Sequence, residues 1–269
     1  MIFVHFNLEM QYLKYILLLL SFLNFAQQSI EVSFVLKTKL NIETLVGVDN
    51  FETRYYLNNN ELVKTENYKK LSTYSNILLG NISSANTFNP LKINVFYKDF
   101  NTVVILDNRL TEMFKIDFNT IQPFKDVTHV STGNDNTIWL FNQNNQQLEN
   151  YDYKNNTTRV EALPIQNDVI DLKSNYNFCW LLTKEYLYTY NYVGSLISKI
   201  NNIGFSKLEQ ENENLVLQKG NQLFYLAKNT NKFVEIKIPK LLINRFLVTN
   251  ETLYIYDDEF LHQYQLKTN

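Results

Sequence analysis

The sequence predicts an all-β protein: a β-propeller of six four-stranded blades, closed by a strand from near the N-terminus. Three observations predict this fold. Short apolar and aromatic runs recur about every 40 residues, a period typical of propeller blades. From Ile30 onward, alternation and short apolar runs replace any long helical period. The last repeat is one strand short. Five or seven blades are alternatives, as is an open β-sandwich or a solenoid.

The recurring runs are strand candidates because they are rich in β-branched and aromatic residues and are followed by polar turns. They are TRYYL from Thr53, TVVIL from Thr102, TIWLF from Thr137, FCWLL from Phe178, NLVLQ from Asn214 and TLYIY from Thr252. The chain has only 6 Gly and 4 Pro, so Asn-rich segments are expected to form the turns. Asn suits them because it tolerates the left-handed region and hydrogen-bonds its own backbone.

The unit around Thr137 can be assigned strand by strand. From the inner to the outer strand, the expected ranges are 127–132, 137–141, 147–153 and 158–163. The next two units repeat this pattern, whereas the last offers three strands, near INRFLVT, TLYIYD and FLHQYQL. An unpaired sheet edge invites aggregation. We therefore expect the strand candidate at residues 30–40 (IEVSFVLKTKL) to supply the missing outer strand.

Residues 1–26 are predicted to be a secretory signal peptide. Lys14 precedes the apolar run Tyr15–Phe25, and the order of basic residue, apolar run and small residue is typical of such segments. We expect cleavage between Ala26 and Gln27. The run is too short for an unassisted transmembrane helix. No stable membrane span is therefore expected after cleavage; an uncleaved signal anchor is the alternative.

Residues 30–269 are then expected to form a single exported domain. Met10 is an alternative start to Met1, because it would give a shorter basic region before the apolar run. Cys179 is the one cysteine, so a disulfide within the chain is impossible. Exported proteins without disulfides are more typical of bacterial envelopes than of eukaryotic extracellular modules. The expected location is the periplasm or cell envelope, or outside the cell.

The charge pattern argues against nucleic-acid binding. The chain has 25 basic and 27 acidic residues, a net charge of −2, and the two signs are well mixed. A duplex-binding surface normally shows a clustered basic patch. We expect a monomer that binds a protein or peptide partner.

The stretch from Asn89 to Phe118 carries a resemblance to a known family. It reads NPLKINVFYKDFNTVVILDNRLTEMFKIDF and resembles an uncharacterised family of exported β-propeller proteins of Bacteroidota, whose pattern is NP-x-K-I-x-x-x-Y-x-D-F-x-x-V-V-x-L-D. The matching positions are Asn89, Pro90, Lys92, Tyr97, Asp99, Phe100, Val104, Leu106 and Asp107. The resemblance implies a propeller fold and export, and no activity.

The residue inventory offers little for catalysis. His129 and His262 are isolated, and no G-x-S-x-G, P-loop or H-E-x-x-H motif occurs. One alternative is a propeller hydrolase, lyase or lactonase that uses channel carboxylates with calcium. The carboxylates would come from Asp107, Asp117, Asp126, Asp135, Asp168 and Asp171, and the calcium ligands from Glu43, Asn86, Asn167, Asp168 and Asn244. No spacing singles these residues out, so we expect no catalytic site and no cofactor.

A carbohydrate-binding module is a second alternative, because aromatic rings stack on sugars. Trp139 and Trp180 fall at equivalent places in adjacent units. Strand packing is expected to bury both of them between neighbouring blades, which argues against a sugar platform.

The preferred hypothesis is a non-catalytic protein-interaction scaffold. Propellers present loops on a rigid ring, and binding residues concentrate on such loops. We expect the binding edge to be formed by loops 86–90, 122–126 and 166–168, which are predicted to lead into inner strands. The partner would be a protein or an extended peptide, which strand addition at a blade edge could also hold. The candidate residues are Asn86, Asn89, Lys125, Asp126, Asn167 and Asp168.

Overall fold

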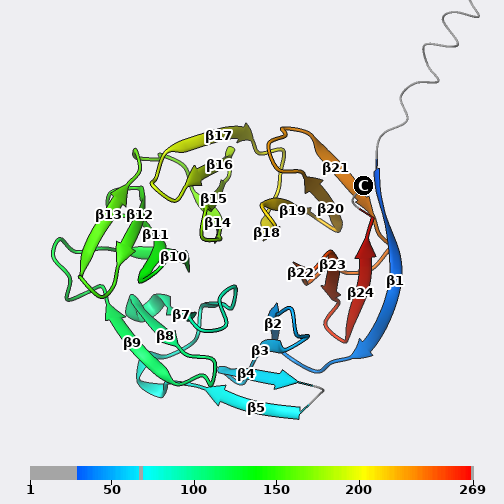
Figure 1. The fold of residues 1–269 in the computed structure, drawn as a ribbon, viewed down its shortest axis with the longest axis horizontal. Helices are drawn as coiled ribbons and strands as arrows, with labels where there is room; N and C mark the ends of the chain where they lie inside the picture. Colours follow the sequence, from blue (N-terminus) through cyan, green and yellow to red (C-terminus); the bar gives the residue numbers. More distant parts are fainter. Residues whose placement is uncertain (1–28, 67–68, 268–269) are drawn as a thin grey trace, which may run out of the picture.

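The computed structural model describes residues 29–66 and 69–267, and Figure 1 shows their sheets arranged in a ring. The predicted signal peptide and its cleavage position lie outside the described residues. Within them there is no α-helix, only two 3-10 turns, η1 (Ile77–Leu79) and η2 (Lys98–Phe100). The all-β prediction is confirmed. No helix of the described part of the chain is long and apolar enough to cross a membrane.

Four of the sheets have four antiparallel strands in chain order. The first contains β2 (Thr44–Val48), β3 (Arg54–Asn58), β4 (Glu61–Glu66) and β5 (Lys69–Tyr74); the second contains β6 (Ser84–Asn86), β7 (Ile93–Tyr97), β8 (Thr102–Leu106) and β9 (Glu112–Asp117). The third contains β10 (Val127–Thr132), β11 (Thr137–Asn142), β12 (Gln147–Asp152) and β13 (Thr157–Glu161). The fourth contains β14 (Val169–Ser174), β15 (Phe178–Thr183), β16 (Tyr186–Asn191) and β17 (Leu196–Asn201).

The remaining strands form one sheet of eight, in the order β18-β19-β20-β21-β1-β24-β23-β22. Its strands are β18 (Lys207–Glu211), β19 (Asn214–Lys219), β20 (Gln222–Leu226), β21 (Phe233–Lys237), β22 (Arg245–Thr249), β23 (Thr252–Tyr256), β24 (Phe260–Leu266) and β1 (Ser29–Lys39). Strand β1 pairs in parallel with β21 and then runs antiparallel to β24, from Val32 opposite Leu266 to Lys39 opposite Phe260. The strand predicted over 30–40 therefore lies beside the three strands of the last repeat.

Strands β2, β10, β14, β18 and β22 lie nearest the centre of the ring (Figure 1), and we call them, with β6, the inner strands. Contacts between these inner strands run from β10 through β14, β18, β22 and β2 to β6, and β7 contacts β10. We call the turns that join each inner strand to the second strand of its sheet the inner turns, and the face that carries them the inner-turn face. The opposite face carries the connections that lead into the inner strands.

The assignment of the second sheet differs from the prediction. TVVIL from Thr102 was expected to be equivalent to the second strand of the other units, but it forms β8, the third strand. The second strand is INVFY, β7. The sequence misleads because β7 and β8 are both buried along their whole length, so their apolar runs look equivalent. The inner strand β6 has only three residues, which gives no clear alternation.

The core is divided among the interfaces between neighbouring sheets. Trp139 on β11 packs with Leu181 and Tyr188 of the next sheet, and Trp180 on β15 packs with Leu215 and Leu217 of the sheet after it. Both tryptophans are buried. Their predicted role in packing between sheets is therefore confirmed. Cys179 is buried between the same sheets, and burial raises the pKa of its thiol well above the usual value.

Asp152 anchors the turn between β12 and β13. One carboxylate oxygen accepts the backbone N–H groups of Lys154 and Asn155 at 3.1 Å each. The other accepts Asn155 Nδ2 at 2.9 Å and Arg159 Nε at 3.0 Å. Burial acts to raise the pKa of Asp152, but the hydrogen bonds to Asn155, Arg159 and Lys154 outweigh it and lower the pKa to about 2.

The Asp152→Asn variant is expected to be about 2 kcal/mol less stable than the wild type near pH 6. Because the folded-state pKa lies below the unfolded one, this stability is present above about pH 4 and is lost as the pH falls towards 2. Urea unfolding at several pH values between 6 and 2.5 should show the two proteins converging. A difference that stays constant down to pH 2.5 would contradict the assignment.

Candidate functional site

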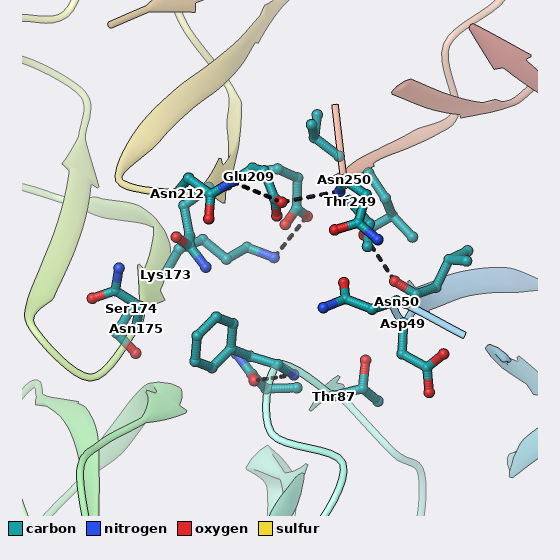
Figure 2. A pocket seen from close by; sticks show the side chains of 18 of the residues that line it. Asp49, Asn50, Thr87, Lys173, Ser174, Asn175, Glu209, Asn212, Thr249 and Asn250 are labelled. Atoms are coloured by element: carbon teal, nitrogen blue, oxygen red, sulfur yellow. Dashed lines mark hydrogen bonds and ion pairs between the residues drawn. The ribbon is translucent and has the colours of Figure 1, made fainter. Parts of the chain in front are cut away.

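A cavity of about 730 Å³ opens at the centre of the inner-turn face (Figure 2). Its lining comes from the inner turns of the β2, β6, β14, β18 and β22 strands and the strand ends beside them. The lining residues are 46–51, 85–88 and 90, 173–177, 209–213 and 247–250, with Lys228. Five repeats thus contribute to one site, so no single stretch of sequence carries it.

The inner turn between β10 and β11, residues 133–136, does not line this cavity. Lys92 holds that turn from the neighbouring sheet. Its buried ammonium donates to the carbonyls of Gly133 at 2.6 Å and of Asp135 and Thr137 at 3.0 Å each. Gly133 is required by close approach, because a Cβ there would lie 2.7 Å from the Thr137 carbonyl oxygen. Burial lowers the pKa of Lys92 to about 8, so the group is still charged near pH 7.

A carboxylate with two cationic partners lies at one side of the cavity. Glu209 Oε1 accepts Lys173 Nζ at 2.7 Å and Arg245 Nη2 at 2.9 Å. Figure 2 shows the Lys173–Glu209 pair with Asn212 and Asn250 beside it. These charges come from the inner strands β14, β18 and β22 and link three neighbouring repeats. Glu209 is therefore already neutralised by its neighbours.

Two other carboxylates are held by amide groups instead of cations. Glu211 Oε1 accepts the backbone N–H of Asn250 at 3.0 Å and Asn212 Nδ2 at 3.3 Å. Asp49 Oδ1 accepts the backbone N–H groups of Phe51 and Thr53 at 2.9 Å each. Burial raises the pKa of Glu211, the Asn250 amide opposes this rise, and nearby Glu251 adds to it.

Aromatic side chains stand at the rim of the cavity. Phe51, in the β2–β3 turn, is 82% exposed. Phe88 and Tyr176 meet edge to face, with their ring centroids 5.2 Å apart. Burial raises the pKa of Tyr176, and a hydrogen bond with Asn89 opposes this rise. Although both tryptophans are buried, the site therefore does offer exposed rings at loop tips.

The six predicted binding residues divide between the two faces. Asn86 lines the central cavity, where its Nδ2 donates to Ser131 Oγ at 3.2 Å. Asn89 lies in the same turn and accepts the Leu91 backbone N–H at 3.0 Å. This turn follows the inner strand β6, whereas the prediction had it lead into an inner strand. The prediction placed it there because it took β8, the third strand of this sheet, for the second. The prediction that loops 86–90, 122–126 and 166–168 share one edge is therefore wrong.

The other four residues lie on the opposite face. Asn167 and Asp168 line a second cavity of about 520 Å³, which also contains His129. Asp168 pairs with Lys184 at 2.5 Å. The backbone carbonyl of Asp126 accepts the Gln143 N–H at 2.7 Å.

Lys125 differs from its neighbours because its side chain is buried. Its Nζ lies 2.5 Å from Glu149 Oε2, and the two side chains are 4% and 0% exposed. Asn142 Nδ2 donates to the other oxygen of Glu149 at 2.8 Å. The ammonium of Lys125 is thus enclosed in the third sheet and is not presented to a partner.

The residues considered for calcium do not share one cavity. Asn86 lines the central cavity, whereas Asn167 and Asp168 line the cavity on the opposite face. Glu43 accepts the Asn59 backbone N–H at 2.9 Å. Within residues 29–66 and 69–267, no group of three or more His, Cys, Asp and Glu side chains is arranged to hold a metal ion.

The second cavity contains His129 of β10, whose side chain is half-buried. His129 Nδ1 lies 3.0 Å from Thr128 Oγ1, and burial lowers the pKa of His129, opposed by nearby Asp171. A neutral imidazole in a cavity can act as a base. Lys98 and Gln143 also line this cavity.

Comparison with known proteins identifies no family. No protein-family profile matches the chain, and no curated protein is significantly similar to it in sequence. Solved structures share its fold. A streptogramin B lyase aligns with a TM-score of 0.62 at 12% identity, over 87% of this chain and 88% of the lyase.

Two other similar structures belong to different kinds of protein. The β-propeller domain of Cps50 (Swd1) from Myceliophteria thermophila aligns with a TM-score of 0.62 at 9% identity, over 87% of this chain and 99% of that domain. A chain of the mitotic checkpoint complex aligns with a TM-score of 0.61 at 10% identity, over 88% of this chain and 86% of that one. At such low identity these likenesses establish the fold alone: the chain has a β-propeller fold.

Proposed function

We propose that this protein is a non-catalytic interaction scaffold that holds a protein or an extended peptide in the central cavity of the inner-turn face. The observation that carries the proposal is the cavity itself, about 730 Å³ in volume and lined from five repeats. Exposed aromatic rings stand at its rim, and aromatic side chains are enriched where proteins bind partners. The fold does not choose the function, because an enzyme and interaction proteins both have it.

The proposal includes a ring of six blades. On this interpretation the eight-stranded sheet is two blades, β18–β21 and β22–β24 with β1, and β1 completes the second of them. Its support is the pairing of β1 with β24 over residues 32–39 and the contact between the inner strands β22 and β2. A closed ring would keep the five contributing turns in fixed positions.

We also propose that the protein is exported to the periplasm or cell envelope and acts there as a monomer. The apolar run Tyr15–Phe25, preceded by Lys14 and followed by Ala26, supports export. N-terminal sequencing of the protein from its source cells should begin at Gln27. A mature protein that begins at Met1 or Met10 would contradict the cleavage.

Site-specific photocrosslinking tests the scaffold function. We would place p-benzoylphenylalanine at Phe51, which is 82% exposed on the inner-turn face, and at Leu163, which is 85% exposed on a connection leading into β14. Irradiation in extracts of the source cells should give a discrete adduct from position 51 and none from position 163. Equal adducts from both positions, or none from either, would contradict the proposal.

The second candidate function is a propeller enzyme, and His129 in the cavity of the opposite face favours it. Its calcium-dependent form makes a clear prediction about thermal melting. The scaffold proposal predicts no change in the melting temperature when calcium replaces EDTA. A rise of several degrees would reveal a metal site in the folded state by mass action and would favour the enzyme.

A further inference from the structure

We propose that the partner presents a basic side chain, lysine or arginine, to the acidic side of the central cavity, where Glu211 and Asp49 receive it. This inference rests on the proposed binding function of the same face. It specifies the chemistry of the partner: a peptide segment with a cationic group and an apolar stem.

The central cavity is lined by both acidic and basic side chains. Asp49, Glu209, Glu211 and Glu213 line the cavity, together with Lys173 and Lys228. Lys173 pairs with Glu209, and Lys228 pairs with Glu213. Glu211 and Asp49 accept hydrogen bonds from amide groups instead. Amide donors carry no charge, so these hydrogen bonds do not neutralise the two carboxylates that a cation entering the cavity would meet.

Glu211 and Asp49 both lie beside the β22–β23 turn. Glu211 bonds to the Asn250 amide at the β22–β23 turn. In the same turn, Thr249 Oγ1 donates to the Val48 carbonyl at 2.8 Å, and Val48 is next to Asp49. The two carboxylates therefore flank one turn on the same side of the cavity, the side on which Figure 2 shows Asp49, Thr249 and Asn250.

Neighbouring charges extend this acidic side. Burial raises the pKa of Glu211, and nearby Glu251 adds to the rise. Burial also raises the pKa of Tyr254, with Glu52 and Asp49 adding to the rise and Arg54 opposing it. Both Glu52 and Glu251 sit in turns at positive φ, 61° and 57°. Glu52 and Glu251 each directly follow a stretch of cavity-lining residues, so their charges add to the negative field beside Asp49 and Glu211.

Aromatic side chains stand at the rim of the same cavity. Phe51 comes from the same turn as Asp49, and Phe88 and Tyr176 line the cavity from two other repeats. Aromatic faces attract lysine and arginine cations and cover their aliphatic stems. A neutral sugar could stack on the rings and donate hydroxyl hydrogen bonds to the carboxylates, but it would leave their negative charge uncompensated. The combination of rings and un-neutralised carboxylates therefore fits a basic peptide better.

Binding of defined peptides to the full chain tests the inference. The probes are fluorescein-labelled, end-blocked nonapeptides of Gly and Ser with three central arginines, and the same peptides with citrulline, which keeps the shape and loses the charge. By fluorescence anisotropy at low salt, the arginine peptide should bind at least about tenfold more tightly than the citrulline peptide. Added salt should weaken its binding, because exposed charges are screened.

Three variants locate the effect. Glu211→Gln and Asp49→Asn keep an oxygen that can accept the amide hydrogen bonds and should each weaken arginine-peptide binding by about fivefold. Asp168→Asn removes an exposed carboxylate on the opposite face and should leave the affinity unchanged. Thermal melting within a few degrees of the wild type would show that each variant is folded.

Equal binding of the two peptides, unchanged affinity in the Glu211 and Asp49 variants, or no binding of the arginine peptide at about 1 mM would overturn the inference. These outcomes are separate from failure of the scaffold function. Crosslinking from position 51 would persist if a partner binds the same face through other groups, and both results would fail together if the face binds nothing.

Discussion

Replacement of Lys125 by methionine is expected to lower the free energy of unfolding by about 3–5 kcal/mol. The substitution leaves the Glu149 carboxylate fully buried with no cation beside it, and only Asn142 and Thr158 still donate to it. A buried ion pair is not strongly stabilising in itself, but removing one partner leaves an uncompensated charge. Urea unfolding near neutral pH measures the loss.

Two controls isolate the cause. Lys184→Met breaks a pair with the same 2.5 Å separation, Lys184 to Asp168, whose side chains are 69% and 73% exposed. That substitution should cost no more than about 1 kcal/mol, because water screens exposed pairs. The double variant Lys125→Met with Glu149→Leu should recover much of the lost stability. A double variant as unstable as the single one would show that packing, not charge, causes the loss.

The second large effect is expected from Lys92→Met, at about 3 kcal/mol. The buried ammonium donates to three carbonyls of the β10–β11 turn, and methionine can satisfy none of them. The Thr137 carbonyl keeps the Gly133 N–H as a donor at 3.1 Å, so the loss falls mainly on the carbonyls of Gly133 and Asp135. Each buried carbonyl left without a donor costs on the order of 1–3 kcal/mol, although the turn can relax to expose some of them to water. Thermal or urea unfolding of the variant gives the value.

Lys64→Met is the matched control for Lys92. Lys64 Nζ donates to a single carbonyl, that of Asn108, at 2.7 Å in an exposed position. Its replacement should change the stability by less than about 1 kcal/mol. If both variants lose equal stability, the three-carbonyl contact is not the cause. The contact also gives a physical role to one position of the family-like stretch, because Lys92 joins the second repeat to the third.

The sequence predicted the repeat well where each repeat has one dominant apolar run, as in the third repeat with TIWLF in β11 and the polar QLENYD in β12. The expected inner strand at 127–132 is the observed β10, and the strand expected at 30–40 is β1 within one residue. It failed in the second repeat, where two strands are equally buried. A shift of one strand exchanges the two faces of a propeller, so this local error misplaced the binding edge.

The candidate site was harder to predict for two physical reasons. Its residues come from five repeats, and only the ring brings them together. Exposure of an aromatic residue has no strong signature in a chain with 18 Tyr and 19 Phe. The weak signal that was available is local: Phe51, Phe88 and Tyr176 each stand next to an asparagine within a turn. Asn favours turns, and a large ring in such a turn is more often exposed than one in a strand.

The pairing of β1 with β24 also determines when folding can finish. Synthesis produces residues 29–39 first among the described strands and residues 260–266 last, yet these segments are hydrogen-bonded partners. The β1–β24 pairing therefore cannot form until the C-terminal strand has emerged, and contacts so distant in sequence form slowly. The eight-stranded sheet can therefore be completed only after residues 260–266 have been synthesised.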